Sequence, residues 1–345
     1  MNSFERVLTA LQHKTPDRIP VYPLINSVSR HVLGINYEEW TKNTDLCAEA
    51  ILKTTDELDL DCICSLVDLS VEAADWGQEL IYFENEAACP DHNNRLVKCV
   101  EDFKNIKKIN PRETPRMSEH IKLCKKLVDA KKNEVPVVGF VFGPLGIASM
   151  LRGQAEIFMD IFDEPELVKE AVEEITQTLE EYVTALIDTG VDAIMFDTLF
   201  ASQTIMSKDM WDEFEGPYIE RLAKLVHDKG VAVMIHNCGG GVYFDVQIAR
   251  MQPEAISFLH IPDDCTSLEN LKEKYGSKTT LIGCVSPGWI ASATIEEVEE
   301  ECRKEIEVLG KGGGFILATG CEYPAFLDFE KAKAMVRVAK EYKNY

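Results

Sequence analysis

The sequence predicts an α/β protein of the (β/α)8, or TIM, barrel class, with an N-terminal extension and a small insertion. Two observations carry this prediction. Short apolar runs alternate with amphipathic, charged helical stretches over most of the chain, and there are about eight such runs. Runs that are apolar on both faces and separated by helices are typical of a parallel sheet covered by helices. Eight strand–helix pairs in one chain most simply close into a barrel.

The expected strands fall into two groups. The later group comprises VPVVGFVFG (135–143), VDAIMFDTLF (191–200), VAVMIHNCG (231–239), EAISFLHIP (254–262), TTLIGCVSP (279–287) and GFILATGC (314–321). The N-terminal third is less regular and supplies RIPVYPL (18–24) and DLDCICSLV (59–67).

Helices are expected between the strands, most clearly over 165–190, 217–230 and 294–313. Each of these stretches ends at glycine, which is a frequent helix C-cap. Residues 78–115 indicate an insertion with short strands and turns, and we expect one domain over 1–345. A doubly wound open sheet is the alternative, but the glycine fingerprint G-x-G-x-x-G after the first strand is missing.

Charge and composition exclude several classes of partner. The formal net charge of −23 would repel nucleic acid and anionic membranes, which favours a small-molecule enzyme or a protein with a basic partner. No apolar stretch is long enough for a membrane span and the N-terminus lacks a signal-peptide pattern, so we expect a cytoplasmic protein. The eleven cysteines are odd in number and show no disulfide framework, which indicates free thiols in a reducing compartment.

The candidate functional residues lie where the expected strands end, because the carboxyl ends of barrel strands line the functional mouth. This set comprises Asp68, Asp197, His236, Cys238, His260, Ser286 and Cys321.

Three of these residues are candidate metal ligands. His236 and Cys238 point to the same side if the strand continues through Cys238, and Cys321 follows a later strand of the same barrel. Three protein ligands with an open fourth position are typical of catalytic zinc, and His260 is the candidate for that position when no substrate is bound. The alternative is a core histidine beside a glycine turn and a buried cysteine. We expect the similar pair Cys62 and Cys64 to serve packing only.

Other candidates have equally open alternatives. Asp197 is a candidate catalytic residue in the mouth, or the N-cap of a helix or a loop brace. Asp68 is a candidate catalytic residue, or part of a solvated loop. Gly239 and Gly240 would let the backbone approach a bound cofactor, or would simply form a strand-to-helix turn.

Four segments together resemble the uroporphyrinogen decarboxylase superfamily over nearly the whole chain. They are the HNCGG turn, GCEYP, the opening ERVLTALQHKTPDRIPVYP and the block FDTLFASQTIMSKDMWDEFEGPYIERL. The H-x-C motif with a distant cysteine resembles the zinc-dependent, cobalamin-linked methyltransferase branch, which includes methylcobamide:coenzyme M methyltransferases. This resemblance implies a (β/α)8 barrel with zinc at its mouth, bound by His236, Cys238 and Cys321.

The resemblance also implies a reaction and partners. Zinc would activate a small substrate, and a methyl group would move between it and a corrinoid (cobalamin) on a carrier protein. The substrate would be a thiol acceptor or an O- or N-methyl donor, and we also consider a homodimer. Where coenzyme M enzymes have an acidic residue, this chain has His260 followed by IPDDC.

Two other functions stay open at this point. One is uroporphyrinogen decarboxylase itself, whose RQAGR motif grips substrate carboxylates. Here the equivalent stretch is PLINSVSRHVLG, in which Arg30 is the one arginine, although Asp68 would match a decarboxylase aspartate. The other is a non-catalytic barrel that binds zinc or a corrinoid.

Overall fold

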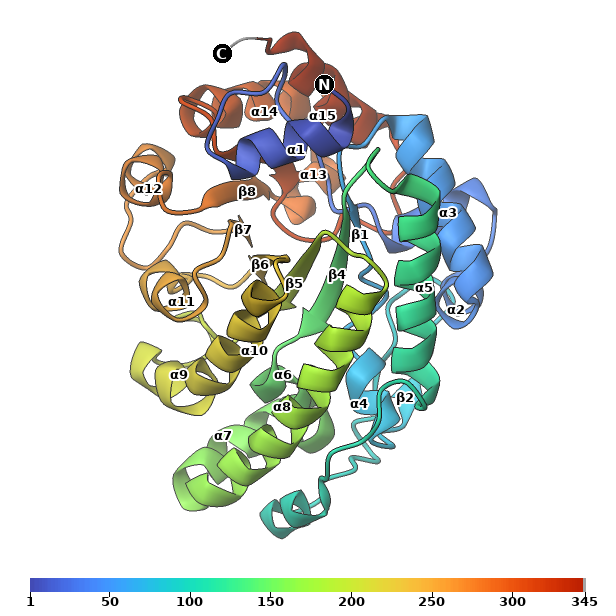
Figure 1. Cartoon of the computed structure of the whole chain (residues 1–345), viewed down its shortest axis with the longest axis vertical. Coiled ribbons are helices and arrows are strands. Elements are labelled where there is room, and N and C mark those ends of the chain that lie inside the picture. The colour runs from blue at the N-terminus through green and yellow to red at the C-terminus, as the bar shows by residue number, and fades with distance from the viewer. Residues whose placement is uncertain (344–345) are drawn as a thin grey trace.

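A sheet of seven parallel strands forms the centre of the molecule, in the order β1-β4-β5-β6-β7-β8-β9. The structure is a computed structural model that describes residues 1–343 (Figure 1). The strands are β1 (Ile63–Cys64), β2 (Leu80–Ile81), β3 (Cys89–Pro90), β4 (Val137–Phe142), β5 (Ala193–Asp197), β6 (Ala232–Asn237), β7 (Ala255–Phe258), β8 (Thr280–Val285) and β9 (Phe315–Thr319).

The segment after Pro20 takes the eighth position and closes the barrel. Val21 forms a parallel bridge with Leu317 of β9, and the Tyr22 N–H donates to the Leu317 carbonyl at 2.8 Å. On the other side, the Asp61 N–H donates to the Val21 carbonyl at 3.0 Å, which joins this segment to the start of β1. The predicted barrel is therefore confirmed. Its eighth strand position is the shortest and is filled by RIPVYPL.

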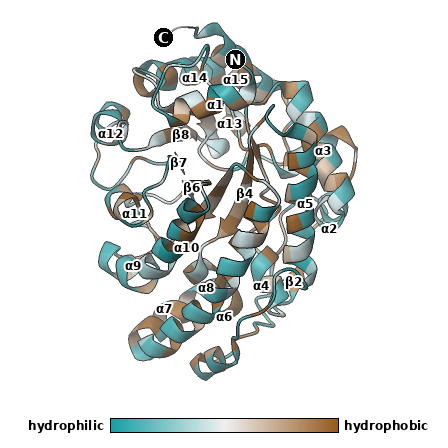
Figure 2. Cartoon of the chain, in the orientation of Figure 1, coloured by the Kyte–Doolittle hydropathy of each residue, from teal (hydrophilic) through white to brown (hydrophobic). Residues whose placement is uncertain are grey.

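Helices surround the strands and hide their outer faces. They are α1 (Ser3–Leu11), α2 (Tyr37–Lys42), α3 (Thr44–Leu58), α4 (Val71–Asp75), α5 (Pro115–Lys131), α6 (Pro144–Arg152), α7 (Gln154–Asp163), α8 (Pro165–Asp188), α9 (Lys208–Phe214), α10 (Gly216–Asp228), α11 (Phe244–Met251), α12 (Leu268–Tyr275), α13 (Pro287–Ser292), α14 (Ile295–Leu309) and α15 (Glu330–Glu341). Figure 2 shows hydrophobic strands inside and hydrophilic stretches on the outer helices. Three of the helices, α8, α10 and α14, match the three clearest sequence predictions.

Two hydrophobic clusters form the core, because successive side chains of a strand point to opposite faces. The larger cluster lies between the strands and the helices. The smaller one fills the barrel interior and includes Cys62 and Cys64, so their predicted packing role is confirmed. Val7 and Ala10 of α1 belong to the interior cluster, so the N-terminal extension covers the amino ends of the strands.

The predicted insertion is also confirmed. β2 and β3 form a small antiparallel pair, and the 3-10 helix Val100–Asn105 follows them.

In Figure 1, α6 and α7 lie at the end of the molecule opposite α1. No helix within residues 1–343 combines the length and the apolar character that crossing a membrane would require.

Candidate metal centre at the barrel mouth

His236 lies near the carboxyl end of β6 and points into the barrel. The alternation of β6 places it on the same face as Met234, which belongs to the interior cluster. The register pairs His236 with Asp197 of β5 on one side and with Ser257 of β7 on the other. Three neighbouring strands therefore present a carboxylate, an imidazole and a hydroxyl at one level of the mouth.

Two thiols join His236 to form a compact group of ligand atoms. Cys238 directly follows β6, and Cys321 lies two residues beyond the end of β9. One ligand atom each of His236, Cys238 and Cys321 lie within 4.8 Å of one another. His236 is buried and both cysteines are half-buried, so the group is reachable from the mouth. The structure thus brings together the three ligands that the sequence predicts.

The turn after β6 fixes the direction in which Cys238 points. The Asn237 side-chain amide donates to the Thr198 carbonyl at 2.6 Å, and its Oδ1 accepts the Gly239 N–H at 2.9 Å. The first bond attaches the end of β6 to the loop after β5, and the second closes the turn around Cys238. Although the strand ends at Asn237, Cys238 keeps its place beside His236 because of this attachment.

The glycines of the turn pack against the loop after β5. A Cβ at Gly239 would lie 2.3 Å from the Ser202 hydroxyl oxygen, and a Cβ at Gly240 would lie 2.8 Å from a methyl carbon of Thr204. A larger residue at either position would require the Ser202 or Thr204 side chain to shift. This packing accounts for the glycines as parts of a turn, and their contact with a cofactor stays a prediction.

The charges of the two thiols are coupled. Hydrogen bonding from Cys238 and from His236 lowers the pKa of the Cys321 thiol, so the first thiolate forms there. The same interaction raises the pKa of Cys238, because a second thiolate would face the first. Burial alone would lower the pKa of His236, but its contact with Cys321 outweighs burial and raises it. The thiols of Cys238 and Cys321 therefore favour one negative charge between them, next to the imidazole of His236.

Asp197 adds a buried carboxylate beside this group. Its Oδ1 is buried and has no hydrogen-bond partner within residues 1–343. Burial raises the pKa of Asp197 to about 6, against the lowering effect of nearby His236. A buried carboxylate oxygen next to a thiolate is costly unless a cation or a proton donor joins it. Two sulfurs and an imidazole nitrogen are also the ligands that zinc prefers in proteins, so these residues fit a zinc ion.

Comparisons with known proteins agree with this architecture. The sequence profile of the family described as uroporphyrinogen decarboxylase (URO-D) matches residues 2–342. The chain belongs to the uroporphyrinogen decarboxylase family. Family membership leaves two activities open, because the proteins similar to this chain include both decarboxylases and methyltransferases.

Two curated members of the uroporphyrinogen decarboxylase family illustrate this division. The methylcobamide:CoM methyltransferase MtbA of Methanosarcina mazei is 26% identical over 248 residues, which cover 72% of this chain and 70% of that protein. The uroporphyrinogen decarboxylase of Ruthia magnifica is 22% identical over 313 residues, which cover 87% and 86%.

A solved structure shows the same fold. A methyltransferase from Methanosarcina mazei superposes with a TM-score of 0.85 and 22% identity, covering 99% of both chains. A B12-independent methionine synthase from Shewanella is more distant, with a TM-score of 0.52, 14% identity and 94% coverage of both chains. These likenesses establish the fold of this family member and leave its substrate open.

His260 and Asp68 lie outside the ligand group. His260 follows the end of β7 by two residues, and its side chain is exposed. Its role as a ligand or catalytic residue stays a prediction. Asp68 is buried, and Arg116 donates to its Oδ2 at 2.5 Å while Ser70 N–H donates to its Oδ1 at 2.8 Å. Because Asp68 is buried in this ion pair, it is not part of a solvated loop. Its catalytic role stays a prediction.

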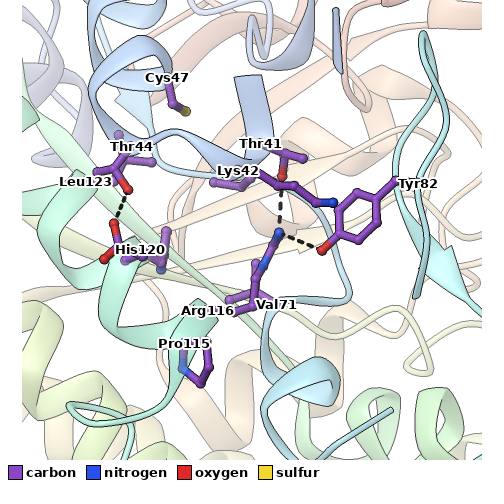
Figure 3. A pocket seen from close by; sticks show the side chains of 12 residues that line it. Thr41, Lys42, Thr44, Cys47, Val71, Tyr82, Pro115, Arg116, His120 and Leu123 are labelled. Atoms are coloured by element: carbon purple, nitrogen blue, oxygen red, sulfur yellow. Dashed lines mark hydrogen bonds between the residues drawn. The ribbon is translucent and has the colours of Figure 1, made fainter. Parts of the chain in front are cut away.

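Arg116 connects Asp68 to a cavity between α2, α3 and α5. Figure 3 shows Arg116 reaching toward Thr41 and Tyr82, to which it donates at 3.3 and 3.1 Å. The cavity has a volume of about 270 Å³, and Lys42 lies over the Tyr82 ring at 3.7 Å. Arg116 thus joins the buried Asp68 to the polar side chains on one wall of this cavity.

Sequence reasoning missed two residues of the site. The sequence pattern assigns no role to Asn237 within HNCGG, and it places Ser257 simply in a buried strand. The period of two would have placed Ser257 on the interior face, since it pairs with His236. A hydroxyl in an otherwise apolar strand is the signal that could have identified it.

Proposed function

We propose that this member of the family is a zinc-dependent methyltransferase. It would move a methyl group between a corrinoid on a carrier protein and a small substrate. The observation that supports this proposal best is the convergence of His236, Cys238 and Cys321 at the barrel mouth. Three protein ligands leave one position for a substrate, whereas structural zinc sites have four protein ligands.

The chain's own residues divide the work in this proposal. His236, Cys238 and Cys321 would hold zinc, which when bound either lowers the pKa of a substrate thiol or polarises the heteroatom of a methyl donor. The Oδ1 of Asp197, which has no hydrogen-bond partner among the described residues 1–343, would accept the proton that a thiol substrate releases. The buried surroundings of Asp197 strengthen that interaction because little water competes for it.

The names of relatives support the corrinoid part of the proposal. Relatives from two Methanosarcina species are methylcobamide:CoM methyltransferases, and the one from Methanosarcina acetivorans is 24% identical over 255 residues. We propose the same class of methyl carrier for this chain and leave the thiol, ether or amine substrate to experiment. Gly239 and Gly240 are proposed to border the approaching corrinoid.

Decarboxylation is the second candidate, because relatives named uroporphyrinogen decarboxylase match most of the chain. The surroundings of Arg30 argue against decarboxylation. That guanidinium is buried and donates to the Ser27 carbonyl at 2.9 Å, and no other arginine lies in the stretch 23–34. A single arginine committed to the backbone gives little grip on a substrate with many carboxylates.

One experiment separates these functions. The zinc-loaded protein is incubated with methylcobalamin and a panel of thiols, and with Co(I) cobalamin and a panel of methoxy and methylamine donors, while the corrinoid spectrum is followed. The proposal predicts a zinc-dependent spectral change with one substrate class. Conversion of uroporphyrinogen to coproporphyrinogen, without any corrinoid change, would support the decarboxylase instead. Zinc that stays four-coordinate with protein ligands only, and neither reaction, would indicate a non-catalytic barrel.

His260 can be tested in the same preparation. If His260 fills the open zinc position before substrate arrives, His260→Ala will change the substrate-free zinc coordination and leave the substrate-bound coordination unaltered. Identical zinc X-ray absorption spectra of both proteins without substrate would remove His260 from the site.

A further inference from the structure

The imidazole of His236 has two ring nitrogens, and only one of them can serve the thiol group. Its Nδ1 lies 3.0 Å from the Ser257 hydroxyl oxygen. Ser257 is completely buried in β7, and the strand register places it directly opposite His236. The hydroxyl therefore cannot turn away to water, and it meets the ring at a position set by the sheet.

We propose that Ser257 is a positioning residue that directs the Nε2 of His236 toward the metal. When the Nδ1–H donates to the Ser257 oxygen, the lone pair of the neutral ring lies on Nε2. The ring is held at the same time in the plane that this hydrogen bond requires. This inference rests on the proposed zinc site and adds the residue that sets the tautomer and the orientation of its one nitrogen ligand.

The energetic reason is the general behaviour of the groups behind metal ligands. A histidine ligand usually donates its other N–H to a fixed oxygen, and loss of that oxygen typically weakens metal binding by about 10- to 100-fold. Cys238 and Cys321 have no comparable restriction because a thiolate can be approached from many directions. The histidine is therefore the ligand for which orientation matters most.

The chain offers a matched control. Ser65, also completely buried, lies 2.8 Å from Nε2 of another buried histidine, His120. His120 is outside the group of candidate ligands. Ser65→Ala removes another buried serine–histidine contact, together with the acceptor of the Phe140 N–H at 3.1 Å. It therefore reports the cost of losing a buried serine hydroxyl that does not contact a candidate ligand.

Zinc affinity of the full-length protein, measured by competition with a chromophoric chelator, tests the proposal. We expect Ser257→Ala to weaken zinc binding by about 10- to 100-fold, Ser257→Thr to restore most of it, and Ser65→Ala to leave it within about twofold. Wild-type affinity in Ser257→Ala would overturn the proposal. If the wild-type protein itself bound no zinc, the proposed function would fail with it, whereas unchanged binding in Ser257→Ala would remove this inference alone.

A second measurement uses the unaltered protein and does not depend on how the variants fold. With ¹¹³Cd in place of zinc and ¹⁵N-labelled histidine, scalar coupling identifies the ring nitrogen that binds the metal. We expect coupling to Nε2 of His236 and a protonated Nδ1. Coupling to Nδ1 would contradict the proposal whatever the variants show.

Discussion

At the scale of single residues, the mouth of this barrel concentrates groups that are costly to bury alone. Two thiols, one imidazole and one carboxylate oxygen lie within a few residues of strand ends, and that oxygen has no hydrogen-bond partner in the described part of the chain. Elsewhere in the barrel interior the same residue type is inert, since Cys64 is packed among apolar side chains. The difference lies in the neighbours: Cys238 and Cys321 each have a second thiol and the imidazole of His236 beside them at the open mouth.

Removal of one thiol should therefore remove the metal. We expect Cys321→Ala to reduce bound zinc from about one per chain to nearly none, because two ligands seldom retain zinc against a chelator. Cys64→Ala, which removes an interior thiol outside the group, should keep full zinc. Metal analysis after dialysis measures both. Full zinc in Cys321→Ala would show that this cysteine is not a ligand.

Sequence reasoning could find the ligands because each one lies at a strand end. His236 and Cys238 share the period of a strand, and Cys321 precedes a turn, so all three could be placed before the structure was known. The contacts behind them were out of reach. Whether a serine such as Ser257 touches a histidine depends on register between strands, and a single sequence does not encode register openly.

At the scale of elements, the barrel has its least extensive strand pairing at the eighth position, where only a short segment pairs with β9. Asp61, which precedes β1, compensates for this. Its buried carboxylate accepts from Arg6 at 2.7 Å, from Arg18 at 2.6 Å and from the Val21 N–H at 2.8 Å. One side chain thus ties α1, the closing segment and β1 together.

Loss of that carboxylate should destabilise the fold strongly. Asp61→Asn leaves the buried guanidinium of Arg18 without its close anionic partner, which should lower the free energy of unfolding by about 3–5 kcal/mol. Asp17 also binds Arg6 but is only half-buried, so Asp17→Asn should cost clearly less than Asp61→Asn. Urea denaturation measures both variants. Equal, small losses would show that Asp61 does not hold the closing segment.

A second element-scale prediction concerns α14. Burial against β8 raises the pKa of Glu305 to about 8, although Cys284 N–H donates to it at 2.8 Å. Because the folded pKa exceeds the ordinary value of 4.5, Glu305 contributes stability fully below about pH 4.5 and loses it as pH rises to about 8. Glu305→Gln should remove this loss and raise stability at pH 8 by roughly 1–3 kcal/mol.

The control for that prediction is Glu300→Gln, an exposed position on the same helix. Its unfolding free energy should follow the wild-type pH dependence between pH 5 and 8. Glu72 and Glu215, whose pKa values burial raises to about 8 and about 7, will keep part of the slope in Glu305→Gln. If Glu305→Gln left the pH dependence of the unfolding free energy unchanged, the Glu305 carboxyl would be ionised in the folded wild-type protein over this pH range.

At the scale of the whole molecule, the barrel could be predicted because each strand is a separate apolar run bounded by helices. The end of β7 could not be predicted: the run 254–262 predicts a strand that reaches His260, but pairing with β8 ends at Ser257 and pairing with β6 ends at Phe258. His260 therefore lies in a loop rather than on a strand. An apolar run marks buried chain, and only the hydrogen bonds of neighbouring strands decide where a strand ends.

The overall charge also has a measurable consequence. With a net charge of −23, repulsion between surface carboxylates opposes the compact state. Screening by 0.3 M sodium chloride, which shortens the Debye length to roughly 6 Å, should raise the melting temperature by about 2–5 °C. The same concentration of an uncharged solute such as glucose serves as control for solute effects. A melting temperature that falls in salt would indicate that ion pairs outweigh the repulsion.

The central claim is that His236, Cys238 and Cys321 form a zinc site with one position free for a substrate. Zinc X-ray absorption of the purified protein, with and without a substrate thiol, tests it most directly. The account predicts two sulfur ligands at about 2.3 Å, one imidazole nitrogen at about 2.0 Å and one light exchangeable ligand that a third sulfur replaces when the thiol is added. Four protein ligands that do not change on addition of thiol, ether or amine substrates, or a site without sulfur, would contradict it.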